Sequence, residues 1–205
     1  MPVRRRVGSR MPVDQSTVRV HNLGLVLRHV ADHGPRSRAR IAAETGLNKT
    51  TVSSLASELI DRGLLREAES ENPRGVGRPS LELQLSGESV AALGLEINVD
   101  YLAACATDFA GRVRHRAFVR CDNRTRSPER VLDDLAAMAN ELLDVISDQR
   151  LEPVGIAVAL PGLVDLPHTT LLVAPNLGWR EVPVAAMLSD RLDVADLPIR
   201  IGNDA

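Results

Sequence analysis

A row of short hydroxylated side chains next to a lysine is the feature of the sequence with the clearest chemistry. Small hydroxyl side chains at the start of a helix let its backbone approach phosphate groups, and the helix dipole and an ammonium group add attraction. We therefore predict that this row faces the major groove of DNA, with Thr50, Thr51 and Ser54 nearest the base edges. Alone, the row suits a solvated helix face slightly better, and the elements around it decide in favour of DNA. Its members lie off the apolar stripe of one predicted helix: Lys49, Thr50, Thr51, Ser53, Ser54 and Ser57.

Two groups of arginines flank this row in the sequence. Arg36, Arg38 and Arg40 lie at the start of the preceding predicted helix, where we expect phosphate contact. Arg74 and Arg78 lie among glycines in the segment 74–79. A glycine-rich loop of this kind brings its backbone close to DNA and inserts arginines into a narrow minor groove. The alternative for that segment is a flexible turn with incidental charges.

The elements that position these side chains follow from the spacing of apolar residues. Three amphipathic helices are predicted, the second and third joined by a turn of about three residues around Gly46. Two strands then form a hairpin with a long polar tip. This order predicts a winged helix-turn-helix. Its local signals are N-caps at Ser37 and Asn48, stops at Gly34-Pro35, Gly46 and Gly63, and strands over 64–68 and 81–85.

From residue 91 the pattern changes to one led by strands. Three strands come first, and a helix follows with Ser127 as its N-cap and Pro128 at its first position. A continuous apolar run, typical of a buried parallel strand, comes next. The order is that of one half of the actin-like ATPase fold, which is ribonuclease H-like, so we expect an α/β chain. The predicted elements are strands over 91–98, 101–107, 113–119, 154–160, 171–174 and 199–201, and helical stretches over 131–146 and 184–192.

The net charge of -2 conceals a division along the chain. Residues 1–80 hold 14 Lys and Arg against 8 Asp and Glu, a net charge of +6, whereas residues 81–205 hold 11 against 19, a net charge of -8. A basic module joined to an acidic one is typical of a DNA-binding head on a separate body. A difference of a few charges between halves also arises by chance.

The composition limits the classes of protein to which the chain can belong. A chain with 44% hydrophobic and 25% charged residues is an ordinary globular protein. The longest apolar runs, such as 155–163, are far shorter than the roughly 20 residues of a membrane helix, so we expect no membrane partner. The basic start is not followed by an apolar stretch, which predicts a cytoplasmic protein without a secretory signal. Cys105 and Cys121 lack metal-ligand spacing, which predicts reduced thiols, no metal site and no cofactor.

Three ordered motifs resemble those of the ROK family (repressor, open reading frame, kinase). Residues 155–165, GIAVALPGLVD, resemble the family's glycine-proline-glycine loop, residues 174–180, APNLGWR, its next motif, and residues 202–205, GNDA, its Asn-Asp motif. The first part of the chain, including Gly77-Arg78-Pro79, is similar to that of the family's repressor branch. The resemblance covers most of the chain. It implies a flexible basic N-terminus (1–17), a winged helix-turn-helix (18–86) and the first, incomplete lobe of an actin-like sensor domain (88–205).

The resemblance also implies a sugar site. In the family's kinases the Asn-Asp pair binds sugar hydroxyls, and the aspartate takes the proton from the accepting hydroxyl. Trp179 either offers an apolar face to the sugar or anchors the core or an interface. The positions to which the family's pocket carries over are Pro161, Gly162, Asn176, Asn203 and Asp204.

Two departures from the family pattern argue against catalysis. The kinases open with an Asp-x-Gly-Gly-Thr type loop whose glycines let the backbone wrap ATP phosphates, but residues 96–100 read EINVD and contain no glycine. The sequence also stops within the Asn-Asp motif, before the family's zinc-binding cluster and second lobe. We expect a fragment of a longer chain.

The sequence therefore predicts a sugar-responsive transcriptional regulator, a repressor of carbohydrate metabolism genes rather than an enzyme. It is expected to bind operator DNA as a homodimer or higher homo-oligomer, with a sugar or sugar phosphate as effector. A ROK-type carbohydrate kinase with an accessory DNA-binding head is the alternative. A DNA-binding module that senses no sugar is a third hypothesis.

Overall fold

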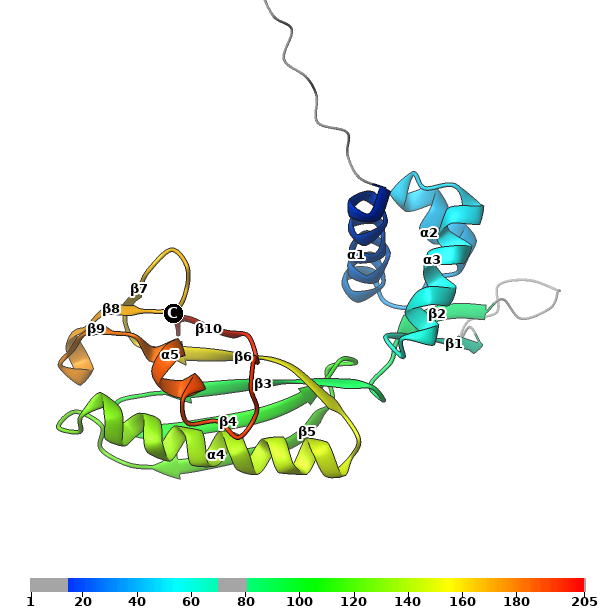
Figure 1. Ribbon diagram of the computed structural model, residues 1–205. Coiled ribbons are helices and arrows are strands. Elements are labelled where there is room, and N and C mark those ends of the chain that lie inside the picture. The colour runs from blue at the N-terminus through cyan, green and yellow to red at the C-terminus, as the bar shows by residue number, and fades with distance from the viewer. Residues whose placement is uncertain (1–14, 70–80, 205) are drawn as a thin grey trace, which may run out of the picture. The chain divides into compact units, whose positions relative to one another are not determined.

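The structure is a computed structural model that describes residues 15–69 and 81–204 (Figure 1). The chain divides into two units, which we call the head (Met1–Leu85) and the body (Ser86–Ala205). The predicted helices and strands of both units are present, with small differences at their ends.

Three helices and a two-stranded sheet build the head (Figure 1). Ser37 caps the second helix by accepting a hydrogen bond from the Arg40 N–H at 3.3 Å, and Gly46 ends it with φ +75°. Asn48 caps the third helix by accepting from the Thr51 N–H at 2.7 Å. Both caps satisfy backbone donors that the first turn leaves unpaired. The helices are α1 (Gln15–His33), α2 (Arg38–Thr45) and α3 (Lys49–Asp61).

The head core forms where the three helices meet the sheet. Strands β1 (Leu65–Glu69) and β2 (Leu81–Leu85) pair antiparallel, with Leu65 opposite Leu85. Leu83 is buried, and its backbone N–H and C=O both bond to Arg36, at 2.8 and 3.1 Å. The sheet is thereby fastened to the turn between α1 and α2. The largest fully buried side chains here are Ile41, Leu55, Leu65 and Leu83.

A five-stranded mixed sheet forms the body, in the order β10-β6-β3-β4-β5. The neighbours β3, β6 and β10 are parallel, whereas β3, β4 and β5 form an antiparallel meander. The edge strands are β10 and β5. The strands are β3 (Val90–Ile97), β4 (Tyr101–Asp108), β5 (Val113–Arg120), β6 (Glu152–Leu160) and β10 (Ile199–Asn203).

Helix α4 (Pro128–Asp148) covers one face of this sheet (Figure 1). Its Ser127 cap and first-turn proline are placed as predicted. The short helix α5 (Val184–Ser189) packs beside α4 and β10, and it ends three residues before the predicted limit. The apolar side chains of α4 and the inward-facing residues of the strands make one continuous core.

A small second sheet lies between β6 and β10 in the sequence. It has the order β7-β8-β9, all antiparallel, with the 3-10 turn η1 (Pro175–Leu177) between its last two strands. Trp179 begins its last strand, is 3% exposed, and donates from Nε1 to the Arg126 carbonyl at 3.2 Å. This tryptophan is a core anchor and presents no open face to a sugar. The strands are β7 (Leu163–Val164), β8 (Leu171–Ala174) and β9 (Trp179–Val182).

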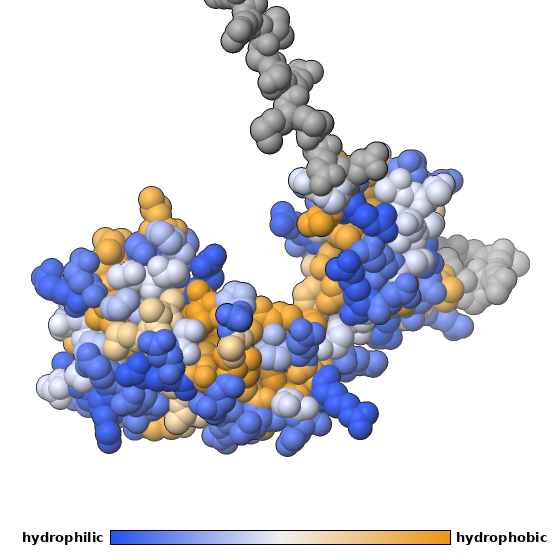
Figure 2. Space-filling view, viewed as in Figure 1, coloured by the Kyte–Doolittle hydropathy of each residue, from blue (hydrophilic) through white to orange (hydrophobic). Residues whose placement is uncertain are grey.

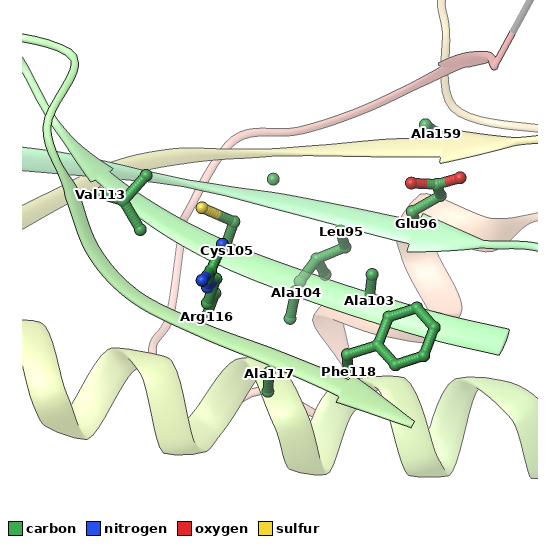
Figure 3. Close-up of a pocket in the computed structure, with 11 residues that line it drawn as sticks. Leu95, Glu96, Ala103, Ala104, Cys105, Val113, Arg116, Ala117, Phe118 and Ala159 are labelled. Atoms are coloured by element: carbon green, nitrogen blue, oxygen red, sulfur yellow. The ribbon is translucent and has the colours of Figure 1, made fainter. Parts of the chain in front are cut away.

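The face of the large sheet opposite α4 carries small side chains. Ala103 and Cys105 alternate with residues that point to α4, because successive side chains of a strand lie on opposite faces. An open groove of about 690 Å³ runs over this face, with Arg116 and Phe118 of β5 along its side (Figure 3). Figure 2 shows apolar surface in the middle of the body, over β6 and β3. No helix within the described ranges is long and apolar enough to cross a membrane.

Candidate DNA interface and effector site

The polar row of α3 is open to solvent. Its apolar stripe, which includes Val52 and Leu55, is buried in the head core. Thr51 is half-buried, and its N–H is taken by the Asn48 cap. The other predicted members of the row are exposed, and this leaves one side of the helix free to meet a ligand: Lys49, Thr50, Ser53, Ser54 and Ser57.

Two arginines neutralise Glu58, one of the two carboxylates near the far end of α3. Glu58 forms ion pairs with Arg19 of α1 at 2.5 Å and with Arg62 at 2.6 Å. The hydrogen bond from Arg19 is the main reason why the pKa of Glu58 lies below its usual value. The first turn of α3 therefore carries the exposed Lys49 at the positive end of the helix dipole, and Glu58 is paired within the head. Phosphate contact at this turn stays a prediction.

The three arginines before and within α2 are held by carboxylates of the head. Arg40 pairs with Glu44 at 2.7 Å, Arg36 lies 3.5 Å from the same carboxylate, and Arg38 pairs with Glu67 of β1. Arg40 remains 62% exposed in its side chain, whereas Arg36 is 20% exposed. Phosphate contact by these side chains, which stays a prediction, would therefore compete with internal ion pairs.

Glu44 is the centre of this network. It also accepts from His29 Nε2 at 2.7 Å, which ties α1 to α2. The hydrogen bonds from Arg40 and then His29 lower the pKa of Glu44 to about 2. The predicted wing-tip residues Arg74 and Arg78 lie outside the described residues, although the strands that carry the tip, β1 and β2, are described.

The body brings two of the predicted sugar ligands together at the carboxyl ends of parallel strands. Asn203 ends β10 and lies opposite Leu160, the last residue of β6. Its Nδ2 donates to the Gly162 carbonyl at 2.9 Å. A Cβ on Gly162 would lie 2.6 Å from both Leu171 Cδ1 and the Val173 carbonyl, so this position admits only glycine. Ligands of open α/β sheets bind at this end of the strands.

The remaining predicted sugar residues surround this pair less directly. Pro161 is half-buried between β6 and Gly162. Asn176 is exposed in η1, directly after β8, the strand that packs against Gly162. Asp204 is exposed and follows Asn203.

His168 is a polar residue near this end of the sheet that sequence reasoning missed. It has φ +57°, its Nδ1 lies 3.2 Å from the Ile201 carbonyl, and its own carbonyl accepts from the Ile201 N–H at 2.9 Å. Asp165 shapes the loop by accepting from the N–H groups of Thr169 and Thr170, and these bonds, that of Thr170 first, lower the pKa of Asp165. The sequence Asp-x-x-x-Thr-Thr signals this turn, but nothing local signals the pairing of His168 with β10.

In the turn between β3 and β4, two backbone N–H groups are occupied by hydrogen bonds within the turn. The kinases of the family hold ATP phosphates at this turn. The Asn98 N–H donates to the Tyr101 carbonyl at 3.0 Å, and the Val99 N–H donates to Asn98 Oδ1 at 2.7 Å. Buried Asn123 donates to the Asn98 carbonyl at 2.7 Å and closes the turn from outside. The backbone donors of Asn98 and Val99 are therefore not available to a phosphate.

Metal-ligand groupings are absent from the described residues: nowhere in 15–69 and 81–204 do three or more His, Cys, Asp or Glu side chains gather to hold an ion. Cys105 and Cys121 are both free thiols.

Comparison with known proteins identifies the families that the two parts of the chain match. Residues 92–205 match the model of the ROK family, and residues 24–74 match that of the MarR family. The chain is 32% identical to the putative xylose repressor of Caldicellulosiruptor sp. strain Rt8B.4, over 88% of this chain and 44% of that protein. It is 28% identical to the xylose repressor of Bacillus subtilis strain 168, over 94% and 48%.

A solved structure shares the fold of both units. The crystal structure of a ROK family transcriptional regulator, a homolog of the E. coli MLC protein, matches with a TM-score of 0.69 and 23% identity, over 91% of this chain and 46% of that one. The fold is that of a winged-helix head followed by an actin-like lobe. The chain belongs to the ROK family. It spans about half the length of the curated relatives it matches.

Proposed function

We propose that this protein is a sequence-specific DNA-binding transcriptional regulator, a repressor of carbohydrate metabolism genes that responds to a sugar or sugar phosphate. The observation that carries the proposal is the open polar side of α3, held in place by the Asn48 cap and the buried stripe beneath it. The names of the xylose repressors from Caldicellulosiruptor and Bacillus support the same role.

On this proposal, α3 lies in the major groove. Lys49 and the first-turn N–H groups fix the helix on the phosphates, and Thr50, Thr51 and Ser54 read base edges. Arg74 and Arg78, which lie between the two wing strands in the sequence, are the residues that we expect to contact the flanking minor groove. A homodimer or higher homo-oligomer presents two such helices to half-sites about one helical turn apart, roughly 34 Å.

The body acts as the sensor. The amide of Asn203, the carboxylate of Asp204 and the Gly162 loop lie at the strand ends, where carboxylates and amides can each make two hydrogen bonds to sugar hydroxyls. Pro161 and Asn176 are the further residues that we expect to contact the sugar. An effector that binds one arrangement of the protein better than another shifts its affinity for DNA by the same coupling free energy. Xylose is the first sugar to test.

The regulator is not an enzyme on this proposal, because the β3–β4 turn offers no free backbone donors from Asn98 and Val99 to hold ATP phosphates. Addition of ATP and a panel of pentoses and hexoses to the full natural protein is expected to give no sugar-dependent ATP consumption. Clear turnover would show that the protein is a kinase with an accessory head.

Electrophoretic shift with duplexes taken from upstream of the protein's own operon tests the main proposal. We expect a sequence-specific complex at physiological salt that a sugar weakens. Binding that shows no preference between the upstream duplex and a scrambled one of the same composition rejects the assignment.

A further inference from the structure

A buried carboxylate with no role in either candidate site lies at the end of β4. The side chain of Asp108 is 0% exposed. Its Oδ1 accepts from the N–H groups of Ala110 and Arg112 at 2.9 and 3.0 Å, and its Oδ2 accepts from Nε of Arg112 and of Arg114 at 2.9 and 2.8 Å. Burial alone would raise the pKa of Asp108, but these donors outweigh burial and hold the pKa below its usual value.

Arg114 carries this charge network to the start of the body. Its Nη2 donates to the Gly87 carbonyl at 2.5 Å, across 27 residues of sequence. Gly87 itself lies against the network, because a Cβ there would be 2.6 Å from Asp108 Cγ. A buried carboxylate can move aside only by losing its donors, so this position requires glycine.

Further bonds fasten the residues around Gly87, which we call the junction segment (residues 86–90). Ser86 is 4% exposed. The Ser89 carbonyl accepts from the Glu152 N–H at 2.8 Å, and the Val90 carbonyl accepts from the Phe109 N–H at 3.3 Å. Strand β2 of the head ends at Leu85 and β3 begins at Val90, so the junction segment contains the whole covalent link between these strands, residues 86–89.

We propose that Asp108, Arg114 and Gly87 form a clamp that fixes the course of the junction segment on the body and so positions the head for binding to two half-sites. The inference rests on the proposed function. A tethered module binds its second site most strongly when the link is short and matched to the span, and loss of order in the link lowers the effective concentration of the module. Arg114 is therefore a positioning residue that has no contact with DNA of its own.

Arg112 provides a matched control for Arg114. Both arginines donate to Asp108 Oδ2. Arg112 is 62% exposed, and although its Nη2 would lie 2.5 Å from a Cβ at Gly87, its hydrogen bonds stay within the β4–β5 turn. Arg114 is 24% exposed and donates to the Gly87 carbonyl. If Asp108 only stabilises that turn, Arg112→Ala and Arg114→Ala will have equal effects. A clamp requires that only Arg114→Ala releases the junction segment.

Hydrogen exchange of the full chain, followed by mass spectrometry, tests the clamp without DNA. Arg114→Ala is expected to speed exchange in peptides covering residues 86–90 about tenfold, since a hydrogen bond from a charged donor is lost, and Arg112→Ala to change it less than about twofold. Gly87→Ala is expected to match Arg114→Ala. Equal exchange in the parent and both of these variants overturns the clamp.

DNA binding provides a second test of the clamp. A palindromic duplex selected by the parent protein from a random pool is compared with a duplex that holds one half-site. Arg114→Ala is expected to lose about tenfold in affinity for the palindrome and to keep its affinity for the half-site. Equal losses on both duplexes count against a positioning role. If the parent selects no duplex, the proposed function fails while the exchange experiment still decides on the clamp.

Discussion

At the scale of single residues, the charges of the head are organised by carboxylates that hold cations in place. Glu44 gathers Arg36, Arg40 and His29 from two helices and the turn between them. The composition shows a basic head, but the ion pairs depend on which residues the fold brings together. Helical spacing predicts Arg40 with Glu44, which are four residues apart, whereas His29 with Glu44 requires the packing of α1 on α2.

Replacement of Glu44 tests this network through pH. Its pKa lies at about 2 in the folded protein against an ordinary 4.5, so its stabilising effect is complete above about pH 4.5 and is lost as the pH falls toward 2. Glu44→Gln should therefore lower the unfolding temperature at pH 7, and the gap to the parent should close as the pH falls through that range. A gap that stays constant with pH would show that the carboxylate charge is not responsible.

The residues of α3 give a second prediction at this scale. Lys49→Ala is expected to weaken binding of all duplexes to a similar degree and to reduce the salt dependence, because an ammonium group contacts phosphates. Thr51→Ala is expected to relax the preference at one base pair, by about 1–3 kcal/mol. Affinity measured over a library of single-base variants separates the two effects. Parental behaviour in both variants would mean that α3 is not the reading helix.

At the scale of elements, the ends of the helices were the most predictable part of the fold, because caps and stops have local sequence signals. The caps at Ser37, Asn48 and Ser127 and the stop at Gly46 stand where the spacing predicts them. The small sheet β7-β8-β9 was predicted only in its middle strand, because strands of two and four residues leave little period to detect. The bond between Asn203 and Gly162 spans 41 residues and has no local signal.

The wing strand β2 depends on one buried side chain. Leu83 is 1% exposed and its neighbour on the same strand, Leu81, is 50% exposed. Leu83→Ala is expected to destabilise the head by about 2–5 kcal/mol through lost burial and a cavity. Leu81→Ala, the matched control, should cost about 0.5 kcal/mol or less. Urea unfolding followed by hydrogen exchange in α1 to α3 measures both, and equal costs would contradict the observed packing.

At the scale of the whole molecule, a head and a body with opposite net charge are joined by the four residues between β2 and β3, 86–89. The positions of the five strands of the large sheet along the sequence were predictable because each carries its own apolar pattern. The sugar residues are a prediction from resemblance, and the structure adds the hydrogen bond from Asn203 at the end of β10 to Gly162 in the loop after β6. The wing-tip arginines remain a prediction from sequence alone.

Loss of the hydrogen bond between Asn203 and Gly162 tests whether the body binds a sugar at this place. Asn203→Ala removes the bond to the Gly162 carbonyl and the amide proposed to hold a sugar. Isothermal titration of the full natural protein with xylose is expected to show at least a tenfold loss of affinity, while the operator complex forms normally without sugar. Arg200→Ala, an exposed change on the same strand, is the control. Unchanged affinity in Asn203→Ala would move the effector site elsewhere.

The open edge of the body sheet has a colloidal consequence. Strand β5 leaves one side of its backbone unpaired, with Val113, Phe118 and Val119 about half exposed, yet it also carries Arg114, Arg116 and Arg120. Like charges keep two such edges apart, and added salt screens that repulsion. The turbidity of a concentrated protein solution should therefore rise with ionic strength. Buffers of low ionic strength keep the protein dispersed, and high salt promotes pairing of one β5 edge with another.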